Sequence, residues 1–427
     1  MKYFRFTALL QSQGWLQPAY VGVDANGRVG YLSNQPPAEP AALETAEALV
    51  LPGFPNAHSH AFQYAMAGYA ERHPPGSTDD FWTWRQTMYR CALSLTPDAM
   101  EQIAYACYRQ MLLHGYTHVV EFHYLHHDEQ GKPYANPAEM GERLIAAAAR
   151  SGIGITLIPV FYQKGGFGQP ALPEQRRFIC PTPDAYFRLL DDAQRAVKHY
   201  DRAALGFGVH SLRAAEPAAI KEIMRHASAD MPFHIHAAEQ KKEVEDCLKH
   251  IGKRPVGWIL ENLPAGSNAH LVHCTHLCNE EVHNLAASGA HVVLCPSTEA
   301  NLGDGIFRLK DYVNAGGQFS IGSDSQIGLN PLEELRWLDY TQRLTTHQRS
   351  TFADGGLTLM RQVIFSGRDA AGLTSDDFFE TGHSFDALVC YTSPDFRFQA
   401  DDALARLIYH TAAVAGVRTL LSGRWAD

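Results

Sequence analysis

Pro55-Asn56-Ala57-His58-Ser59-His60 closes the first strongly apolar run of this 427-residue chain, Ala48–Pro55. An open, doubly wound α/β sheet that binds a nucleotide carries a glycine-rich turn after its first strand. This stretch contains no glycine and instead places two histidines in a His-x-His arrangement. The sequence at this point therefore favours a closed parallel barrel over the nucleotide-binding sheet.

Beyond this stretch, short apolar runs alternate with longer segments of helical periodicity. The further predicted strands are Thr117–His123, Gly154–Phe161, Leu205–His210, Met231–Ala237, His270–Cys274, His291–Pro296 and Gln318–Gly322. The predicted helices are Pro97–His114, Pro137–Ser151, Pro183–His199, Pro217–Ala227, Glu243–Asn262, Glu280–Ser288, Lys310–Ala315 and Pro331–Leu344. Eight strand–helix units predict an α/β fold, a (β/α)₈ TIM-type barrel whose parallel sheet is covered by helices.

Both ends of the chain depart from this pattern. The first 47 residues contain short alternating stretches and an Asn26-Gly27 pair, which is a strong hairpin-turn signal. Near the other end, Phe385–Tyr391 and Arg418–Trp425 have the character of strands. We therefore predict a small β-rich domain built from residues 1–47 and 385–427, beside a barrel domain of residues 48–384.

The composition is that of an ordinary globular protein, with 45% hydrophobic and 19% charged residues. Asp and Glu number 46 against 36 Lys and Arg, and the net charge of −10 argues against nucleic acid as a partner. No apolar run reaches the roughly 18 residues of a membrane span, and the first residues do not resemble a secretion signal. We expect no membrane association and a cytoplasmic location, in which the eight cysteines stay free thiols.

Polar residues gather at the predicted strand ends, which face one shared mouth in a barrel. They are His58, His60, Glu121, His123, Tyr124, His210, Arg213, His234, His236, Glu239, His273, His276 and Asp324. Alternate residues of a strand point the same way, so His58 and His60 can reach one ion. Together with His236 and Asp324 they form a donor set that suits Zn²⁺ or Fe²⁺. We predict one divalent metal ion, with Zn²⁺ as the first candidate.

Glu239 stands three residues after His236, where a carboxylate beside a metal-activated water can move protons. The alternative is a charge at a helix N-terminus, which the helix dipole stabilises by about 0.3–1 kcal/mol. We favour the role in proton transfer. His234 lies on the same strand but is expected deeper in the barrel, as a core histidine or as a support for the site.

Several of these stretches resemble the signatures of the amidohydrolase superfamily. Leu51–His60 is similar to its first-strand signature, and His236-Ala237-Ala238-Glu239, His273 and Ser323-Asp324 are similar to its later ones, in the same order. The set resembles the one-metal branch that contains adenosine, guanine and cytosine deaminases. The resemblance implies that His58, His60, His236 and Asp324 bind the metal. It also implies that Glu239, His273 and Asp324 are catalytic.

Longer blocks resemble the formimidoylglutamate deiminase family within this superfamily. They are Phe81–Arg85, Glu121–Tyr124, His210–Arg213, Ser297–Gly305 and Glu333–Trp337. This resemblance implies hydrolysis of N-formimidoyl-L-glutamate to N-formyl-L-glutamate and ammonia in histidine degradation, by a homodimer. Arginine suits the two carboxylates of that small-molecule substrate, because its planar fork binds a carboxylate bidentately. Arg85 and Arg213 are the candidates, and Gln63, Tyr124 and His210 match family positions that line the same pocket.

Alternatives stay open at this point. One alternative is a deaminase of the same branch that acts on a purine, pterin or guanidine. Another is a barrel protein that binds metal without turnover. The alternative for Arg85 is a surface arginine stacked on Trp82 or Trp84. The alternative for Tyr124 is a buried phenol that is hydrogen-bonded to the backbone. The resemblance also leads us to expect histidine at position 326, where this chain has Gln326.

Overall fold

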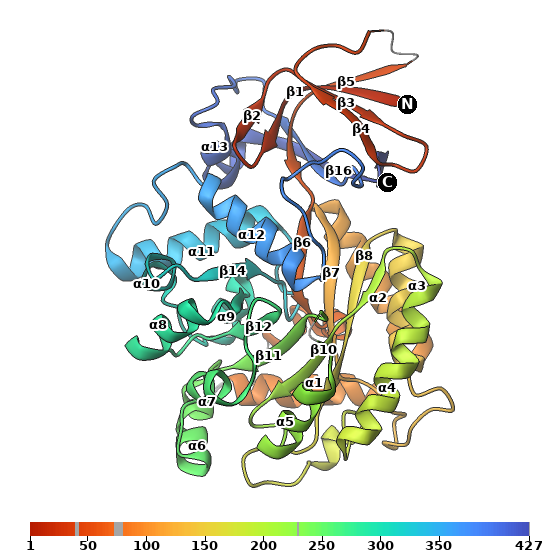
Figure 1. Cartoon of the computed structure of the whole chain (residues 1–427), viewed down its shortest axis with the longest axis vertical. Coiled ribbons are helices and arrows are strands. Elements are labelled where there is room, and N and C mark those ends of the chain that lie inside the picture. Colours follow the sequence, from red (N-terminus) through yellow and green to blue (C-terminus); the bar gives the residue numbers. More distant parts are fainter. Residues whose placement is uncertain (39–41, 72–79, 229, 427) are drawn as a thin grey trace.

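The computed structural model of the chain describes residues 1–38, 42–71, 80–228 and 230–426. Two sheets organise these residues (Figure 1). A parallel barrel sheet occupies the middle of the molecule, and a second sheet, formed by both chain ends, lies at the top in this view.

The barrel sheet has eight strands in the order β14-β13-β12-β11-β10-β8-β7-β6, and β9 pairs with β8 beside this path. Their bounds are β6 Phe54–Ser59, β7 Tyr116–His123, β8 Gly154–Phe161, β9 Ala203–Leu205, β10 Phe207–Ser211, β11 Phe233–Ala237, β12 Ala269–His273, β13 His291–Leu294 and β14 Gln318–Ile321. A parallel bridge between Ser59 and Asp324 joins the last strand to the first. The Asp324 amide donates to the His58 carbonyl at 3.0 Å, and the His60 amide to the Asp324 carbonyl at 3.1 Å. The predicted barrel is confirmed, and its closure places these residues side by side.

Helices surround the barrel strands (Figure 1). They are α1 Phe81–Ser94, α2 Pro97–Leu113, α3 Glu139–Ser151, α4 Pro183–Ala196, α5 Pro217–His226, α6 Lys241–Ile251, α7 Pro255–Asn262, α8 Asn279–Ser288, α9 Pro296–Leu302, α10 Leu309–Asn314, α11 Pro331–Thr346 and α12 Leu357–Ala370. Proline opens α2, α4, α5, α7, α9 and α11, because its fixed φ suits the first turn. None of the helices in the described ranges has the length and apolar character of a membrane span.

The prediction of one helix over Glu243–Asn262 is wrong. Gly252 ends α6 in the left-handed region at φ 79°, and Pro255 starts α7 as a separate helix. A glycine cap followed closely by proline stops a helix even where the apolar periodicity continues.

The terminal sheet has the order β17-β16-β15-β5-β1-β3-β4, with β2 paired to β1. Its strands are β1 Lys2–Gln11, β2 Gly14–Leu16, β3 Ala19–Val23, β4 Val29–Ser33, β5 Leu43–Pro52, β15 Ala387–Thr392, β16 Val414–Leu421 and β17 Arg424–Trp425, with helix α13 Ala403–Tyr409 between β15 and β16. The Asn26-Gly27 turn joins β3 to β4, and Gly27 has the positive φ of 80° that such a turn requires. Both chain ends therefore contribute strands to one small sheet.

The predicted strand Ala48–Pro55 is divided between the two sheets. Its first part belongs to β5, which pairs with β1 and β15 in the terminal sheet, and its last part starts β6 of the barrel. Gly53 separates them, and a Cβ at this position would lie only 2.4 Å from the Thr117 hydroxyl. The boundary drawn at residue 47 cuts through β5, so we propose Gly53 as the division between the two parts.

Candidate metal centre and substrate pocket

The four predicted metal ligands converge at the C-terminal ends of the barrel strands. His58 and His60 lie at the end of β6, His236 on β11 and Asp324 directly after β14, and all four are buried. One donor atom from each lies within 4.8 Å of the others. The Nε2 atom of His58 is 3.2 Å from that of His60 and 3.0 Å from that of His236. Asp324 Oδ1 lies 3.5 Å and 3.2 Å from the same nitrogens of His58 and His60.

The outer nitrogens of two of these rings fix how the rings face the centre. His60 Nδ1 lies 2.8 Å from the Phe122 carbonyl, and His236 Nδ1 lies 3.0 Å from the His210 carbonyl. A carbonyl only accepts, so each Nδ1 carries a proton, and Nε2 is the ring atom left to ligate an ion at the centre. Burial lowers the pKa of His58 to about 3 and the pKa of His236 well below its usual value. Neutral imidazoles facing a carboxylate fit one divalent cation.

His273 lies between two carboxylates at the edge of this centre. Its Nε2 atom is 3.7 Å from Asp324 Oδ2 and 3.8 Å from Glu239 Oε1, and its Nδ1 atom is 3.3 Å from Glu299 Oε1. Burial lowers the pKa of His273, but the three carboxylates outweigh it and raise that pKa to about 10. His273 and Asp324 both have positive φ, 70° and 48°, a strained backbone that clusters at functional sites. The three residues predicted to be catalytic thus lie together.

Glu239 contacts Arg213 on its other side. The Arg213 guanidinium lies 2.9 Å from Glu239 Oε2 and 3.4 Å from Glu243 Oε2, and the Glu239 amide donates to Glu243 at 3.1 Å. Glu239 precedes α6, yet its carboxylate faces Arg213 and His273 in the barrel mouth. This arrangement suits a group that transfers protons better than it suits a helix-terminal charge.

The five residues predicted to bind substrate line one pocket together with three of the four predicted metal ligands. Gln63, Arg85, Tyr124, His210 and Arg213 share this pocket with His60, His236, Glu239 and Asp324. The Tyr124 hydroxyl accepts from Gln63 Nε2 at 3.0 Å, so its partner is a pocket side chain. The Arg85 guanidinium lies over the rings of Trp82 at 5.4 Å and Tyr89 at 5.1 Å. The expected stacking of Arg85 on Trp82 is therefore present in addition to its place in the pocket.

Other lining residues were not predicted, notably Tyr89, Tyr162 and Phe178. Tyr162 follows directly on the predicted strand Gly154–Phe161, and that strand-end position is the signal that could have found it. Tyr89 stands four residues after Arg85, on the same face of α1. Phe178 lies in a long loop, where the sequence has no periodic signal.

Two of the other strand-end histidines lie outside the metal group. The first is His123, whose ring lies 4.9 Å from that of His126 and which is not part of the metal group. His234 Nε2 bonds the Ala370 carbonyl at 2.9 Å, in agreement with a buried core position. All eight cysteines are free, as expected.

A buried polar network lies behind the metal ligands. Gln326 Nε2 donates to Ser59 Oγ at 2.9 Å, and Ser323 Oγ donates to Gln326 Oε1 at 2.7 Å. Ser59 Oγ also donates to Glu121 at 2.7 Å, and Asn56 Nδ2 to Ser323 Oγ at 2.6 Å. Gln326 takes the place where we expected histidine. It connects the ends of the first and last strands through residues that flank three metal ligands.

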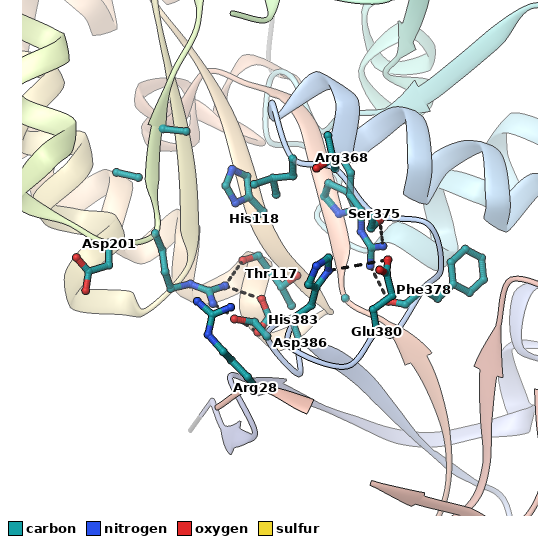
Figure 2. A pocket seen from close by; sticks show the side chains of 18 residues that line it. Arg28, Thr117, His118, Asp201, Arg368, Ser375, Phe378, Glu380, His383 and Asp386 are labelled. Carbon is teal, nitrogen blue, oxygen red and sulfur yellow. Dashed lines mark hydrogen bonds and ion pairs between the residues drawn. The ribbon is translucent and has the colours of Figure 1, made fainter. Parts of the chain in front are cut away.

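A second cavity lies at the opposite end of the barrel strands, toward the terminal sheet. Figure 2 shows Arg28, Thr117, His118, Arg368, His383 and Asp386 around it. Arg202 Nη2 donates to Asp386 Oδ2 at 2.6 Å, and Arg368 donates to the carbonyls of Asp377 and Phe378. In barrels of this type the catalytic residues lie at the C-terminal ends of the strands, whereas residues at the N-terminal ends, where this cavity lies, stabilise the fold. The cavity is therefore not the candidate active site.

Comparisons with known proteins agree with this geometry. A model of the amidohydrolase family matches residues 49–366. Formimidoylglutamate deiminase of Pseudomonas aeruginosa is 42% identical over 424 residues, which are 97% of this chain and 92% of that relative. The crystal structure of an amidohydrolase from Brucella melitensis superposes with a TM-score of 0.91 at 39% identity, covering 100% of this chain and 94% of the other. An adenosine deaminase from Xanthomonas campestris with bound zinc shares the fold, with a TM-score of 0.80 at 21% identity over 99% of this chain and 92% of that one. Because the family model spans well over half of its residues, this chain belongs to the amidohydrolase family.

Proposed function

We propose that this chain hydrolyses N-formimidoyl-L-glutamate to N-formyl-L-glutamate and ammonia, with one divalent metal ion at the four-residue centre. The observation that carries the proposal is that Arg85 and Arg213 line the same pocket as residues of the metal centre. Two arginines suit a substrate with two carboxylates. The 42% identity to a formimidoylglutamate deiminase supports the same substrate.

Zinc is the proposed ion, because three imidazoles and one carboxylate suit it and a zinc-bound deaminase shares the fold. Fe²⁺ suits the same donors and is the alternative. When bound, such an ion supplies Lewis-acid chemistry that makes a water molecule a nucleophile near neutral pH.

The proposed proton transfers use Asp324, His273 and Glu239. Asp324 accepts a proton from the attacking water, and His273, 3.7 Å away, stabilises the developing charge. The water oxygen bonds to the formimidoyl carbon while Glu239 protonates the terminal imine nitrogen. As the C–N bond breaks, the proton held by Asp324 passes to the leaving nitrogen, which departs as ammonia. The proton of the added hydroxyl returns to Glu239, and the carbon becomes a formyl carbonyl.

Binding of the glutamate part is assigned to the rest of the pocket. His210 lies on β10 and Arg213 follows that strand, and the contact of Arg213 with Glu239 at 2.9 Å suits the carboxylate closer to the reacting carbon. Arg85, Gln63 and Tyr124 line the remaining side. We place the reaction in histidine degradation in the cytoplasm, with the chain as a homodimer.

Ammonia release by purified, metal-analysed protein tests the proposal. We expect release from N-formimidoyl-L-glutamate together with N-formyl-L-glutamate, and far slower release from guanine, adenosine, a pterin and a guanidino acid. Faster turnover of any of these four, or none of N-formimidoyl-L-glutamate by metal-loaded protein, would overturn it.

A further inference from the structure

Gln175 is a buried glutamine in the loop between β8 and α4, and its amide has a determined orientation. Its Oε1 atom accepts from the Leu172 amide at 2.7 Å. A backbone N–H can only donate, so the oxygen of the Gln175 side chain faces Leu172 and the nitrogen faces the other way. Gln175 is fully buried, and this orientation is therefore held by the fold.

The nitrogen of Gln175 points at two phenols of the substrate pocket. Nε2 lies 2.9 Å from the Tyr89 hydroxyl and 2.8 Å from the Tyr162 hydroxyl. An amide NH₂ has two protons and no lone pair to offer, so both phenol oxygens accept from Gln175. Within residues 1–38, 42–71, 80–228 and 230–426, neither hydroxyl proton has a protein acceptor. Both phenols are therefore left as donors.

Arg85 brings a positive charge to the same place. Its Nη2 lies 3.4 Å from the Tyr162 hydroxyl, and its guanidinium lies over the Tyr89 ring. Arg213, the other pocket arginine, already contacts two carboxylates. Arg85 forms no ion pair with any residue that the structure describes, so its charge is available to an anion.

We propose that Gln175 is a positioning residue that turns Tyr89 and Tyr162 into paired hydroxyl donors beside Arg85, which together bind the substrate carboxylate farther from the reacting carbon. The hydroxyl protons of Tyr89 and Tyr162 and the guanidinium of Arg85 can then all donate to one carboxylate, which accepts several hydrogen bonds. Each phenol oxygen already accepts from Gln175, and that of Tyr162 also accepts from Arg85 at 3.4 Å, so the group that each phenol offers to a ligand is its proton. The subsite thus selects a carboxylate over a carboxamide, which would also present N–H donors.

The position of Tyr162 suits this distal role. Its ring lies 4.5 Å from that of His210, which in turn lies 4.9 Å from that of the metal ligand His236. The imidazole of His210 thus lies between Tyr162 and the metal ligand, so Tyr162 is set apart from the metal centre. The inference rests on the proposed function for the identity of the substrate, but the subsite can be tested without turnover.

Binding of glutarate and its monoamide, glutaramate, to zinc-loaded protein by calorimetry tests the subsite directly. We expect glutarate to bind at least about tenfold more tightly than glutaramate, since hydrogen bonds to a charged group are the stronger ones. Gln175→Met keeps the size of the side chain and removes both donors, so this preference should fall to about twofold or less. Tyr89→Phe with Tyr162→Phe keeps both rings and should have the same effect.

Gln342→Met is the matched control, because Gln342 is also a buried glutamine, bonded to the Phe307 carbonyl at 3.0 Å on α11. It should leave the preference for glutarate unchanged. In kinetics, Gln175→Met should raise KM for N-formimidoyl-L-glutamate about tenfold or more and change kcat little. The same substitution should leave KM for N-formimidoyl-L-glutamine unaltered.

Two results would overturn the inference: wild-type protein that does not prefer glutarate, or variants that weaken both ligands equally. If Gln175→Met does not fold, the double phenylalanine variant decides between the same outcomes. The proposed function fails separately. Wild-type protein that binds glutarate in this pattern but releases no ammonia would remove the reaction and keep the subsite.

Discussion

Arg213 and Glu239 form a buried ion pair at 2.9 Å, and Glu239 faces His273 with its other oxygen at 3.8 Å. One carboxylate therefore contacts both a cation that we propose to bind substrate and a residue of the proposed proton-transfer group. In the proposed mechanism, Glu239 thus links substrate binding to proton transfer.

Replacement of Glu239 by Gln removes the proton donor and keeps the shape of the side chain. We expect kcat to fall by about 10²–10⁴-fold, the usual contribution of general acid–base catalysis. The metal content should not change, because Glu239 is not among the four predicted ligands. Steady-state kinetics with metal analysis of the same sample checks this, and a near-normal kcat would remove Glu239 from the mechanism.

Replacement of Arg213 by Met should raise KM for N-formimidoyl-L-glutamate by about tenfold or more, because a charged hydrogen bond to a carboxylate is lost. The metal content should stay the same. Arg254→Met is the matched control, since Arg254 forms a comparable pair with Glu281 at 2.6 Å outside the pocket. An unchanged KM in the Arg213 variant would assign that residue to structure alone.

Replacement of Gln326 by Met should weaken zinc binding by about 10–100-fold, the usual effect of losing a partner that orients metal ligands. Gln326 connects Ser59, between His58 and His60, to Ser323, next to Asp324. Competition with a chelator measures the affinity, and the Gln342→Met protein controls for loss of a buried amide. Equal affinities of the two variants would show that the network does not position the ligands.

Glu334 gives a prediction about pH. Burial raises the pKa of Glu334 to about 8, and its hydrogen bonds from Ser297 only partly offset this. Between the unfolded-state pKa of about 4.3 and the folded-state pKa of about 8, Glu334 ionises in the unfolded chain but stays protonated in the folded one. Its contribution to the free energy of unfolding is therefore fully present below about pH 4.3 and is lost as pH rises toward 8. Glu334→Gln cannot ionise, so its Tm should gain on that of the wild type as pH rises through this window.

Thermal unfolding of both proteins across this pH window measures the difference. Glu333→Gln, at the exposed neighbouring position, should run parallel to the wild type. A Tm difference between Glu334→Gln and wild type that stays constant with pH would contradict the assignment of a raised pKa to Glu334.

The convergence of the four candidate metal ligands could be predicted because the signal is local. Each lies at or directly after a strand of recognisable apolar character, and a barrel brings all such ends to one mouth. His58 and His60 share a strand, so their common direction follows from the alternation of side chains. The small sheet was also predictable from the Asn26-Gly27 turn and the strands near the chain ends.

What escaped prediction depends on packing between distant segments. The run Ala48–Pro55 is apolar throughout because both of its halves are buried, so composition alone could not divide it between two sheets. Gln175 comes from a loop without periodicity, and only the fold brings it to Tyr89, 86 residues away in sequence. The pairing of Arg213 with Glu239 likewise required coordinates.

Titration of metal-free protein with Zn²⁺, followed by ammonia release from N-formimidoyl-L-glutamate at each step, tests the central claim most directly. The four converging ligands predict that activity rises in proportion to zinc and levels off at one ion per chain. Full activity without metal, a plateau at two ions, or zinc-saturated protein that releases no ammonia would contradict it.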